Sequence, residues 1–157
     1  MGKRNLNKPV SDLRAHIGFW MRQISNLVSY SFAARLESRG VTVAEWVVLR
    51  EMYPAQSVTS PGAIAELTGL TRGAVSKLVS RLHIKKLLSR NESSQDRRYQ
   101  ELLLTPTARA LVPELAALAD ENDAEFFSVL TDSEKKTLMN ILKKLAGAHR
   151  PRGMPVD

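Results

Sequence analysis

Lys and Arg residues that could bind an anion are concentrated between positions 71 and 100. This segment carries eight Lys or Arg residues and only two acids, in a chain of 157 residues with a net charge of +7. Residues 1–22 add five bases against one acid, whereas residues 111–148 are net acidic. Clustered cations attract anions, so the pattern predicts an anionic partner: nucleic acid first, an acidic membrane surface second. The simpler alternative is that the charges only solvate a surface.

Residues suited to catalysis or metal binding are few. The chain has no Cys, which excludes disulfides, thiolate metal sites and regulation by thiol oxidation. Its three histidines, His16, His83 and His149, are far apart and lack a metal-binding spacing. We therefore expect no enzyme activity, no catalytic residues, no metal and no cofactor.

Targeting signals are also missing from the sequence. No apolar run reaches the roughly 18 residues that a membrane-spanning helix needs. Residues 1–9 are basic and lack the apolar segment of a signal peptide. The sequence therefore predicts a cytoplasmic protein without a membrane partner.

Apolar residues recur at helical spacing near both ends of the chain. Residues 11–38 read as one long amphipathic helix, and residues 106–147 as helical with a kink or a new start at Pro113. Capping boxes begin helices at Thr42 and Thr131, and Gly147 is expected to end the last one. The stripe expected to be buried near the C-terminus is Leu111, Leu115, Leu118, Asn122, Phe126, Val129, Leu138, Ile141, Leu142 and Leu145.

A helix-turn-helix pattern followed by a hairpin lies between these segments. Ser60-Pro61 begins a short helix, Gly69 permits a tight turn, and Thr71 caps a longer helix that runs to about residue 86. Short strands at 87–90 and 99–104 then flank a polar stretch, which indicates a β-hairpin. The expected fold is mainly α with a small β-wing: a winged helix-turn-helix lobe over residues 42–104, plus N- and C-terminal helices.

The second helix of this motif has the composition of a DNA-reading surface. With Val75, Leu78, Val79 and Leu82 facing inward, small, polar and cationic side chains face outward, where they suit a major groove. The hairpin tip adds Arg97 and Arg98, a second anion-binding device suited to a narrow minor groove, and Asp96 is expected to orient Arg98. The DNA-facing residues expected on the helix are Thr71, Arg72, Gly73, Ser76, Lys77, Ser80 and Arg81.

The run from residue 63 to residue 111 resembles the MarR family of winged-helix transcriptional regulators. The likeness is carried by the segments 63–68, 71–82 and 104–111, and by a D-x-R wing motif that falls on Asp96 and Arg98. The terminal helices extend it to about residues 11–147.

The resemblance implies one MarR-like domain over residues 1–157. Helices at 11–38 and 106–147 would form a homodimer, the lobe at 42–104 would bind pseudo-palindromic double-stranded DNA, and residues 1–9 and 150–157 would be flexible.

Three positions depart from the family pattern at the end of the second helix. Lys86 stands where the family usually has Gly, so the helix is expected either to end in a non-Gly positive φ or to run on. His83 replaces a usual acid, and Ile84 falls on the outward face, where it either packs on the wing or is exposed.

Ligand sensing is suggested by the same resemblance, because many family members release DNA on binding small aromatic or phenolic anions. His16, Trp20, Trp46 and Arg50 are candidates for a pocket of that kind. The alternative is that both tryptophans belong to the core and that His16 is a polar group at an interface.

Three functions compete on these observations. The favoured one is a dimeric, sequence-specific DNA-binding regulator, and more narrowly a repressor relieved by a small aromatic ligand. The alternative is a winged-helix module that binds protein or RNA without operator specificity. An enzyme is the least supported, because no nucleophile–base pair or metal cluster is evident.

Overall fold

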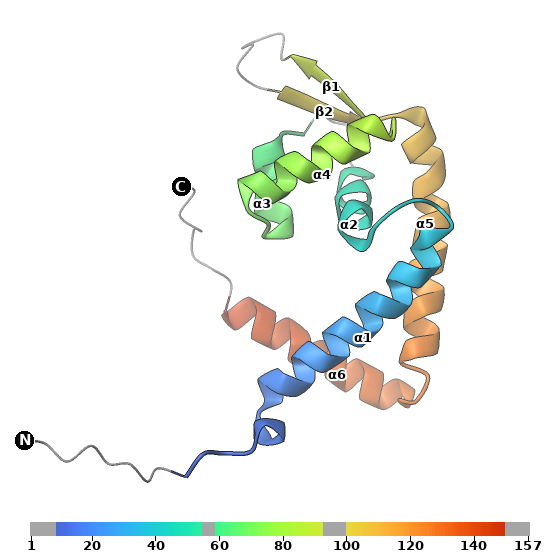
Figure 1. Cartoon of the computed structure of the whole chain (residues 1–157). Coiled ribbons are helices and arrows are strands. Elements are labelled where there is room, and N and C mark those ends of the chain that lie inside the picture. Colours follow the sequence, from blue (N-terminus) through green and yellow to red (C-terminus); the bar gives the residue numbers. More distant parts are fainter. Residues whose placement is uncertain (1–8, 55–58, 93–99, 150–157) are drawn as a thin grey trace, which may run out of the picture. The chain divides into compact units, whose positions relative to one another are not determined.

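The computed structural model describes residues 9–54, 59–92 and 100–149. It divides into two compact units, Met1–Asn122 and Asp123–Asp157. The predicted fold class, mainly α with a small β-wing, is confirmed (Figure 1). The elements in chain order are η1 (Leu13–Ala15), α1 (Ile17–Glu37), α2 (Val43–Met52), α3 (Pro61–Thr68), α4 (Arg72–Ile84), β1 (Leu88–Glu92), β2 (Gln100–Leu104), α5 (Pro106–Phe126) and α6 (Asp132–Ala148).

The helix starts predicted from capping residues are confirmed, because each depends on residues only three positions apart. Thr42 accepts from the Glu45 N–H at 3.2 Å, and the Glu45 carboxylate accepts from the Thr42 N–H at 2.9 Å. Thr131 forms a capping box with Glu134 in the same way. Ser60 and Thr71 cap α3 and α4, and Gly69 between them has a φ of 67°.

The end of α4 is closed by a Schellman motif without glycine. The Leu87 N–H donates to the Leu82 carbonyl and the Lys86 N–H to the His83 carbonyl, both at 2.9 Å. These bonds place Lys86 in the left-handed region, with a φ of 58°. The expected non-Gly positive φ is therefore confirmed, and α4 does not run on to residue 86.

Replacing Lys86 by Gly should stabilise the fold by about 0.5–1 kcal/mol, since glycine has no Cβ to clash in this conformation. Thermal or urea unfolding of the variant measures this gain. Lys86→Ala is the matched control and should bring no gain, because alanine keeps the Cβ. A Gly variant no more stable than the Ala variant would contradict a strained helix end.

Strands β1 and β2 form an antiparallel pair in the register Leu88↔Leu104 to Glu92↔Gln100. Thr59 extends the sheet through backbone hydrogen bonds to Leu102 of 2.8 and 3.1 Å. The hairpin is confirmed at its base. Asp96, Arg97 and Arg98 of the predicted tip lie outside the described residues.

The core of the first unit joins the C-terminal half of α1 to α2, α4, the strands and the first part of α5. The inward stripe of α4 is buried as predicted. The largest fully buried apolar side chains of this core are Leu36, Leu49, Leu82, Leu88, Leu102, Leu115, Val48, Val75, Val79 and Val112.

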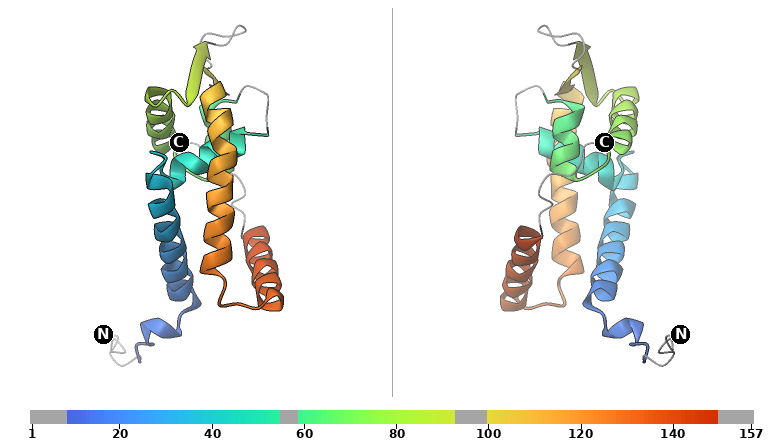
Figure 2. Two further views of the ribbon diagram at one scale, coloured as in Figure 1. Left: turned by 90° about the vertical axis from the view of Figure 1, so that its right-hand side faces the viewer. Right: turned by 90° about the vertical axis from the view of Figure 1, so that its left-hand side faces the viewer.

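A row of polar contacts aligns α1 with α5, which run side by side in Figure 2. The Ser31 hydroxyl donates to Asn122 at 2.8 Å, and Arg39 pairs with Glu114 at 2.9 Å. Asn122 is only 2% exposed, as its place on the predicted stripe implied. Ser31 lies on α1 and Arg39 just beyond its C-terminal end, whereas Asn122 and Glu114 both lie on α5, so the two contacts fix one antiparallel register.

Several predicted boundaries are wrong. The first helix begins at Ile17 rather than 11, because a short 3-10 turn and the extended His16 precede it. Of the two alternatives expected at Pro113, a new helix start is excluded: α5 continues through it, and Val112 and Leu115 on either side are buried. Gly147 does not end α6, which runs on to Ala148.

The predicted burial holds for Leu115 and Asn122 of α5 but is wrong within one chain for Val129 and for the stripe of α6. Leu138 is half-buried, whereas Ile141, Leu142 and Leu145 are 40–51% exposed. Val129 lies beyond the end of α5 and is 86% exposed. No residue of α6 is buried in the described chain.

Candidate nucleic-acid interface

Helix α4 is held from two sides, by α3 and by the base of the wing (Figure 1). The left-handed Gly69 reverses the chain after α3, and Thr71 starts α4 by accepting the Ala74 N–H at 3.2 Å. The inward stripe fixes the rotation of α4. Of the predicted DNA-facing residues, Thr71, Arg72, Gly73, Ser76, Lys77 and Arg81 are exposed, and Ser80 is half-buried.

The outward face of α4 carries a shallow, open depression lined by Ser76, Lys77, Ser80 and Arg81. Within the described chain, Lys77 and Arg72 make no polar contact with other side chains or with the backbone. Their charges are therefore available to an external anion. The face combines free cations with hydroxyl groups that can donate or accept, as reading of base edges requires.

Ser80 has a role inside the protein as well. Its hydroxyl oxygen accepts a 2.8 Å hydrogen bond from Nη2 of Arg90, on β1. The hydroxyl proton remains available, so Ser80 can still donate to a base or a phosphate. Arg90 is half-buried, and its Nε has no partner within the described residues. From the sequence, Arg90 was only one of the eight cations of residues 71–100. In the structure, its hydrogen bond to Ser80 joins the wing to α4.

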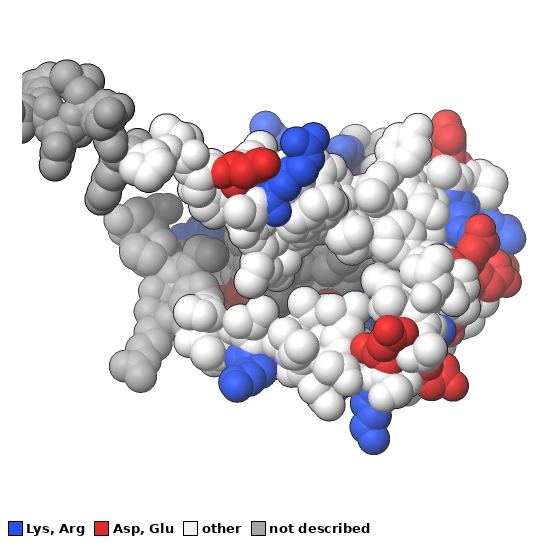
Figure 3. Space-filling view, turned by 90° about the horizontal axis from the view of Figure 1, so that it is seen from below, with Lys and Arg blue, Asp and Glu red and all other residues white. Residues whose placement is uncertain are grey.

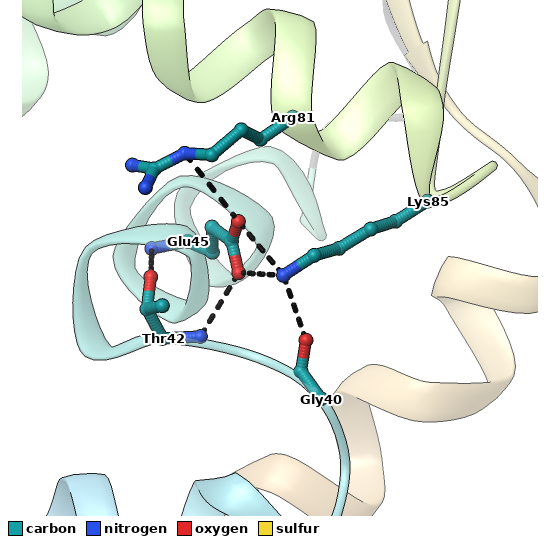
Figure 4. Close-up of polar contacts among 5 residues, drawn as sticks. All are labelled: Gly40, Thr42, Glu45, Arg81 and Lys85. Carbon is teal, nitrogen blue, oxygen red and sulfur yellow. Dashed lines mark hydrogen bonds and ion pairs between the residues drawn. The ribbon is translucent and has the colours of Figure 1, made fainter.

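A buried carboxylate, that of Glu45 on α2, lies beside the basic helix (Figure 4). Its Oε2 is 2.7 Å from the Lys85 Nζ, which also donates to the Gly40 carbonyl at 2.7 Å. The Arg81 Nε lies 3.9 Å from the other carboxylate oxygen. Only the capping role of Glu45 was predicted, because its partners lie some 40 residues further along the chain.

Opposing influences act on the pKa of Glu45. Burial is the largest of them and raises the pKa. The hydrogen bonds from Lys85 and from the Thr42 backbone, with the charges of Lys85 and Arg81, together outweigh it and lower the pKa below its ordinary value. Glu45 is therefore ionised at neutral pH.

His83 and Ile84 mark the end of α4. The Nδ1 of His83 lies 3.0 Å from the Leu88 carbonyl, which can only accept, so this nitrogen carries a proton. Ile84 is 78% exposed, so it does not pack on the described part of the wing, which was the other alternative.

A model of the MarR family matches residues 39–98, which include α2, α3, α4 and β1. BpsR of Bordetella bronchiseptica, whose DNA binding is regulated by 6-hydroxynicotinic acid, is 25% identical over 88% of this chain and 98% of its own, with a TM-score of 0.79. A probable transcriptional regulator of Pseudomonas aeruginosa is 26% identical over 85% and 99%, with a TM-score of 0.79.

The protein MepR of S. aureus, solved in complex with DNA, is 25% identical over 85% of this chain and 98% of its own, with a TM-score of 0.78. This chain therefore contains a MarR-like winged-helix region over residues 39–98. Its fold is that of the family's winged-helix transcriptional regulators.

The candidate ligand residues form two separate groups in this chain. Trp46 packs edge-on against Phe32 with a ring distance of 6.1 Å, and Arg50 is exposed on the same helix, α2. Trp20 is 51% exposed, and its indole donates to the Arg14 carbonyl at 2.9 Å. His16 immediately precedes α1, with its Nε2 3.2 Å from the Ser11 hydroxyl.

Trp20 and Phe32 lie on one helix, separated by 12 positions, which is about 18 Å along α1. The single chain therefore does not gather the four candidates around one cavity. Trp46 is partly buried against the core, as the core interpretation expected, whereas Trp20 is not covered.

Metal ligands and membrane-spanning helices are both absent from the described residues. No group of three or more His, Asp or Glu side chains in the described part of the chain could hold a metal ion. Among the described helices, none is both long and apolar enough to cross a membrane.

Proposed function

We propose that this protein is a dimeric, sequence-specific DNA-binding transcriptional regulator in which α4 of each subunit enters a major groove. The observation that carries the proposal is the outward face of α4, where Arg72 and Lys77 are exposed and free of partners in the described chain. The DNA complex of MepR, a protein of the same fold, supports it. Double-stranded DNA with a pseudo-palindromic operator is the proposed partner, and the cytoplasm is the proposed place of action.

The finer proposal is a repressor whose DNA binding is relieved by a small aromatic ligand. Support comes from BpsR, whose regulator, 6-hydroxynicotinic acid, is an aromatic acid. His16, Trp20, Trp46 and Arg50 stay the candidate ligand residues. A site that used all four would need a second subunit, because one chain keeps His16 and Trp20 apart from Trp46.

A homodimer is proposed because α1 and α6 leave apolar side chains uncovered. In the view of Figure 3, Lys and Arg are scattered among uncharged side chains and do not gather in one place. Uncovered apolar side chains suit a protein partner better than DNA. The exposed apolar residues of η1, α1 and α6 are Leu13, Ile17, Trp20, Met21, Ile24, Leu27, Tyr30, Met139, Ile141, Leu142 and Leu145.

The domain organisation proposed from the resemblance accompanies this dimer. The whole chain, 1–157, would act as one MarR-like domain, with residues 11–38 and 106–147 in the interface and residues 42–104 on DNA.

For the wing, Arg98→Ala should weaken binding to all duplexes by a similar factor. The salt dependence of binding should flatten by about one unit for each phosphate that a subunit no longer contacts, because fewer counterions are released. Asp96→Ala should also weaken binding, because its proposed role is to orient Arg98. Affinities for specific and random duplexes across a salt series measure both effects.

The Asp96 variant separates orientation from net charge, since deleting an acid would otherwise favour DNA. Tighter binding by Asp96→Ala would contradict the orienting role. Unchanged binding of Arg98→Ala on both duplexes would mean that the wing does not touch DNA.

The alternative is a winged-helix module that binds protein or RNA without operator specificity. A gel shift of the pure protein on the DNA upstream of its own coding sequence distinguishes the two. We expect a discrete shift that unrelated duplex competes away poorly. Equal competition by any duplex, or by RNA, would favour the alternative.

A further inference from the structure

Three cations form a row on one side of α4, at intervals of four residues: Lys77, Arg81 and Lys85. Each step of four turns about 40° around a helix and advances about 6 Å along it. The row therefore rotates from the exposed face, where Lys77 has no partner in the described chain, toward α2, where Lys85 reaches Glu45 at 2.7 Å. Arg81 lies between these two environments, with 54% of its side chain exposed.

The carboxylate of Glu45 is a fixed point rather than a mobile surface charge. It has no exposed area, and the Thr42 N–H and the Lys85 ammonium both hold it. Only the Nε side of the Arg81 guanidinium faces it, at 3.9 Å. Figure 4 shows the two terminal nitrogens of Arg81 pointing away from Glu45, where their donors remain available.

We propose that Glu45 is a positioning residue for DNA binding, an inference that rests on the proposed DNA-binding function. Its carboxylate holds Arg81 by the Nε edge, so that the terminal nitrogens meet the phosphate backbone beside the groove. Lys77, which nothing in the described chain restrains, is left to reach the base edges. Because of one buried acid on α2, Arg81 contacts the phosphate backbone and Lys77 contacts the bases.

Two effects of Glu45 on DNA oppose each other, and their sizes decide the sign. Its negative charge repels phosphates, but the charge of Lys85 neutralises it. At physiological ionic strength, one charge about 10 Å from a phosphate changes DNA affinity less than about twofold. An oriented arginine–phosphate contact contributes more, about 3–10-fold. Removing the charge should therefore weaken binding, whereas repulsion alone would make it tighter.

The test is a double-mutant cycle on a duplex selected from a randomised pool by the wild-type protein. Glu45→Gln keeps an acceptor for the Thr42 N–H, and melting curves report whether each variant is folded. We expect Glu45→Gln and Arg81→Ala each to weaken binding about 3–10-fold, and Glu45→Gln to change it less than about twofold once Arg81 is Ala. A purely structural effect would persist in the Arg81→Ala background and would overturn the proposal, as would tighter binding by Glu45→Gln.

DNA binding by the Arg81→Lys variant is a second test, and it does not require a change to a buried residue. The variant keeps the charge at a largely exposed position but loses the guanidinium fork. Binding about as weak as that of Arg81→Ala supports the proposal, and binding equal to wild type overturns it.

Lys77→Ala on the same duplex separates this inference from the proposed function. If wild type binds, Lys77→Ala weakens binding and Glu45→Gln is silent, the positioning role alone fails. If wild type binds no duplex, both fail.

Discussion

Ile24→Asp should convert the protein to a monomer and weaken operator binding at least about 100-fold. Ile24 lies on the uncovered apolar stripe of α1 and is 43% exposed in one chain. An aspartate there would have to be buried in the dimer without a partner, at a cost of several kcal/mol. Two linked half-site contacts would then become one, and linkage of this kind multiplies affinity by about 10²–10⁴.

Light scattering at micromolar concentration and a binding titration measure the two consequences. Asn26→Asp is the matched control, since it places the same charge on the opposite side of α1, at an exposed position. It should stay dimeric and bind the operator as wild type does. A monomeric wild type, or a dimeric Ile24→Asp variant, would show that this stripe of α1 is not the interface.

Lys77→Ala should lower affinity for the operator more than affinity for random DNA, by about 1–3 kcal/mol for each base that the protein no longer contacts. The reason is that Lys77 is exposed on the groove-facing side of α4 and has no partner in the described chain. Parallel titrations on the two duplexes measure the difference. Ser76→Ala should behave in the same way, with a smaller change in salt dependence because no charge is removed.

Lys143→Ala is the control for net charge, since Lys143 is exposed and belongs to α6 rather than to α4. It should affect both duplexes equally and slightly. Equal losses of affinity by Lys77→Ala on operator and random DNA would make Lys77 a phosphate contact and would require another residue to read the bases.

Local features of the fold were predictable because their causes lie within a few residues. Thr42, Ser60, Thr71 and Thr131 cap their helices through bonds to groups three positions away, and the positive φ of Gly69 follows from the short turn. The outward face of α4 followed from the helical period alone. Even the unusual end at Lys86 was one of two outcomes that the sequence allowed.

Features that depend on distant residues were not predictable. Glu45 and Lys85 are 40 positions apart, and no period in the sequence relates them. The bond from Arg90 to Ser80 depends on how the strand crosses the helix. An apolar stripe also does not reveal what covers it, so Leu142 and Leu145 were expected to be buried although they are 40% exposed in one chain.

Selection of duplexes from a randomised pool by the wild-type protein tests whether it is a dimeric, sequence-specific DNA-binding regulator. A dimer with one α4 in each of two successive major grooves should enrich a two-fold symmetric sequence. The centres of its half-sites should lie about one DNA turn apart, roughly 34 Å. Failure to enrich any sequence, or enrichment of a site without two-fold symmetry, would contradict a dimeric, sequence-specific regulator.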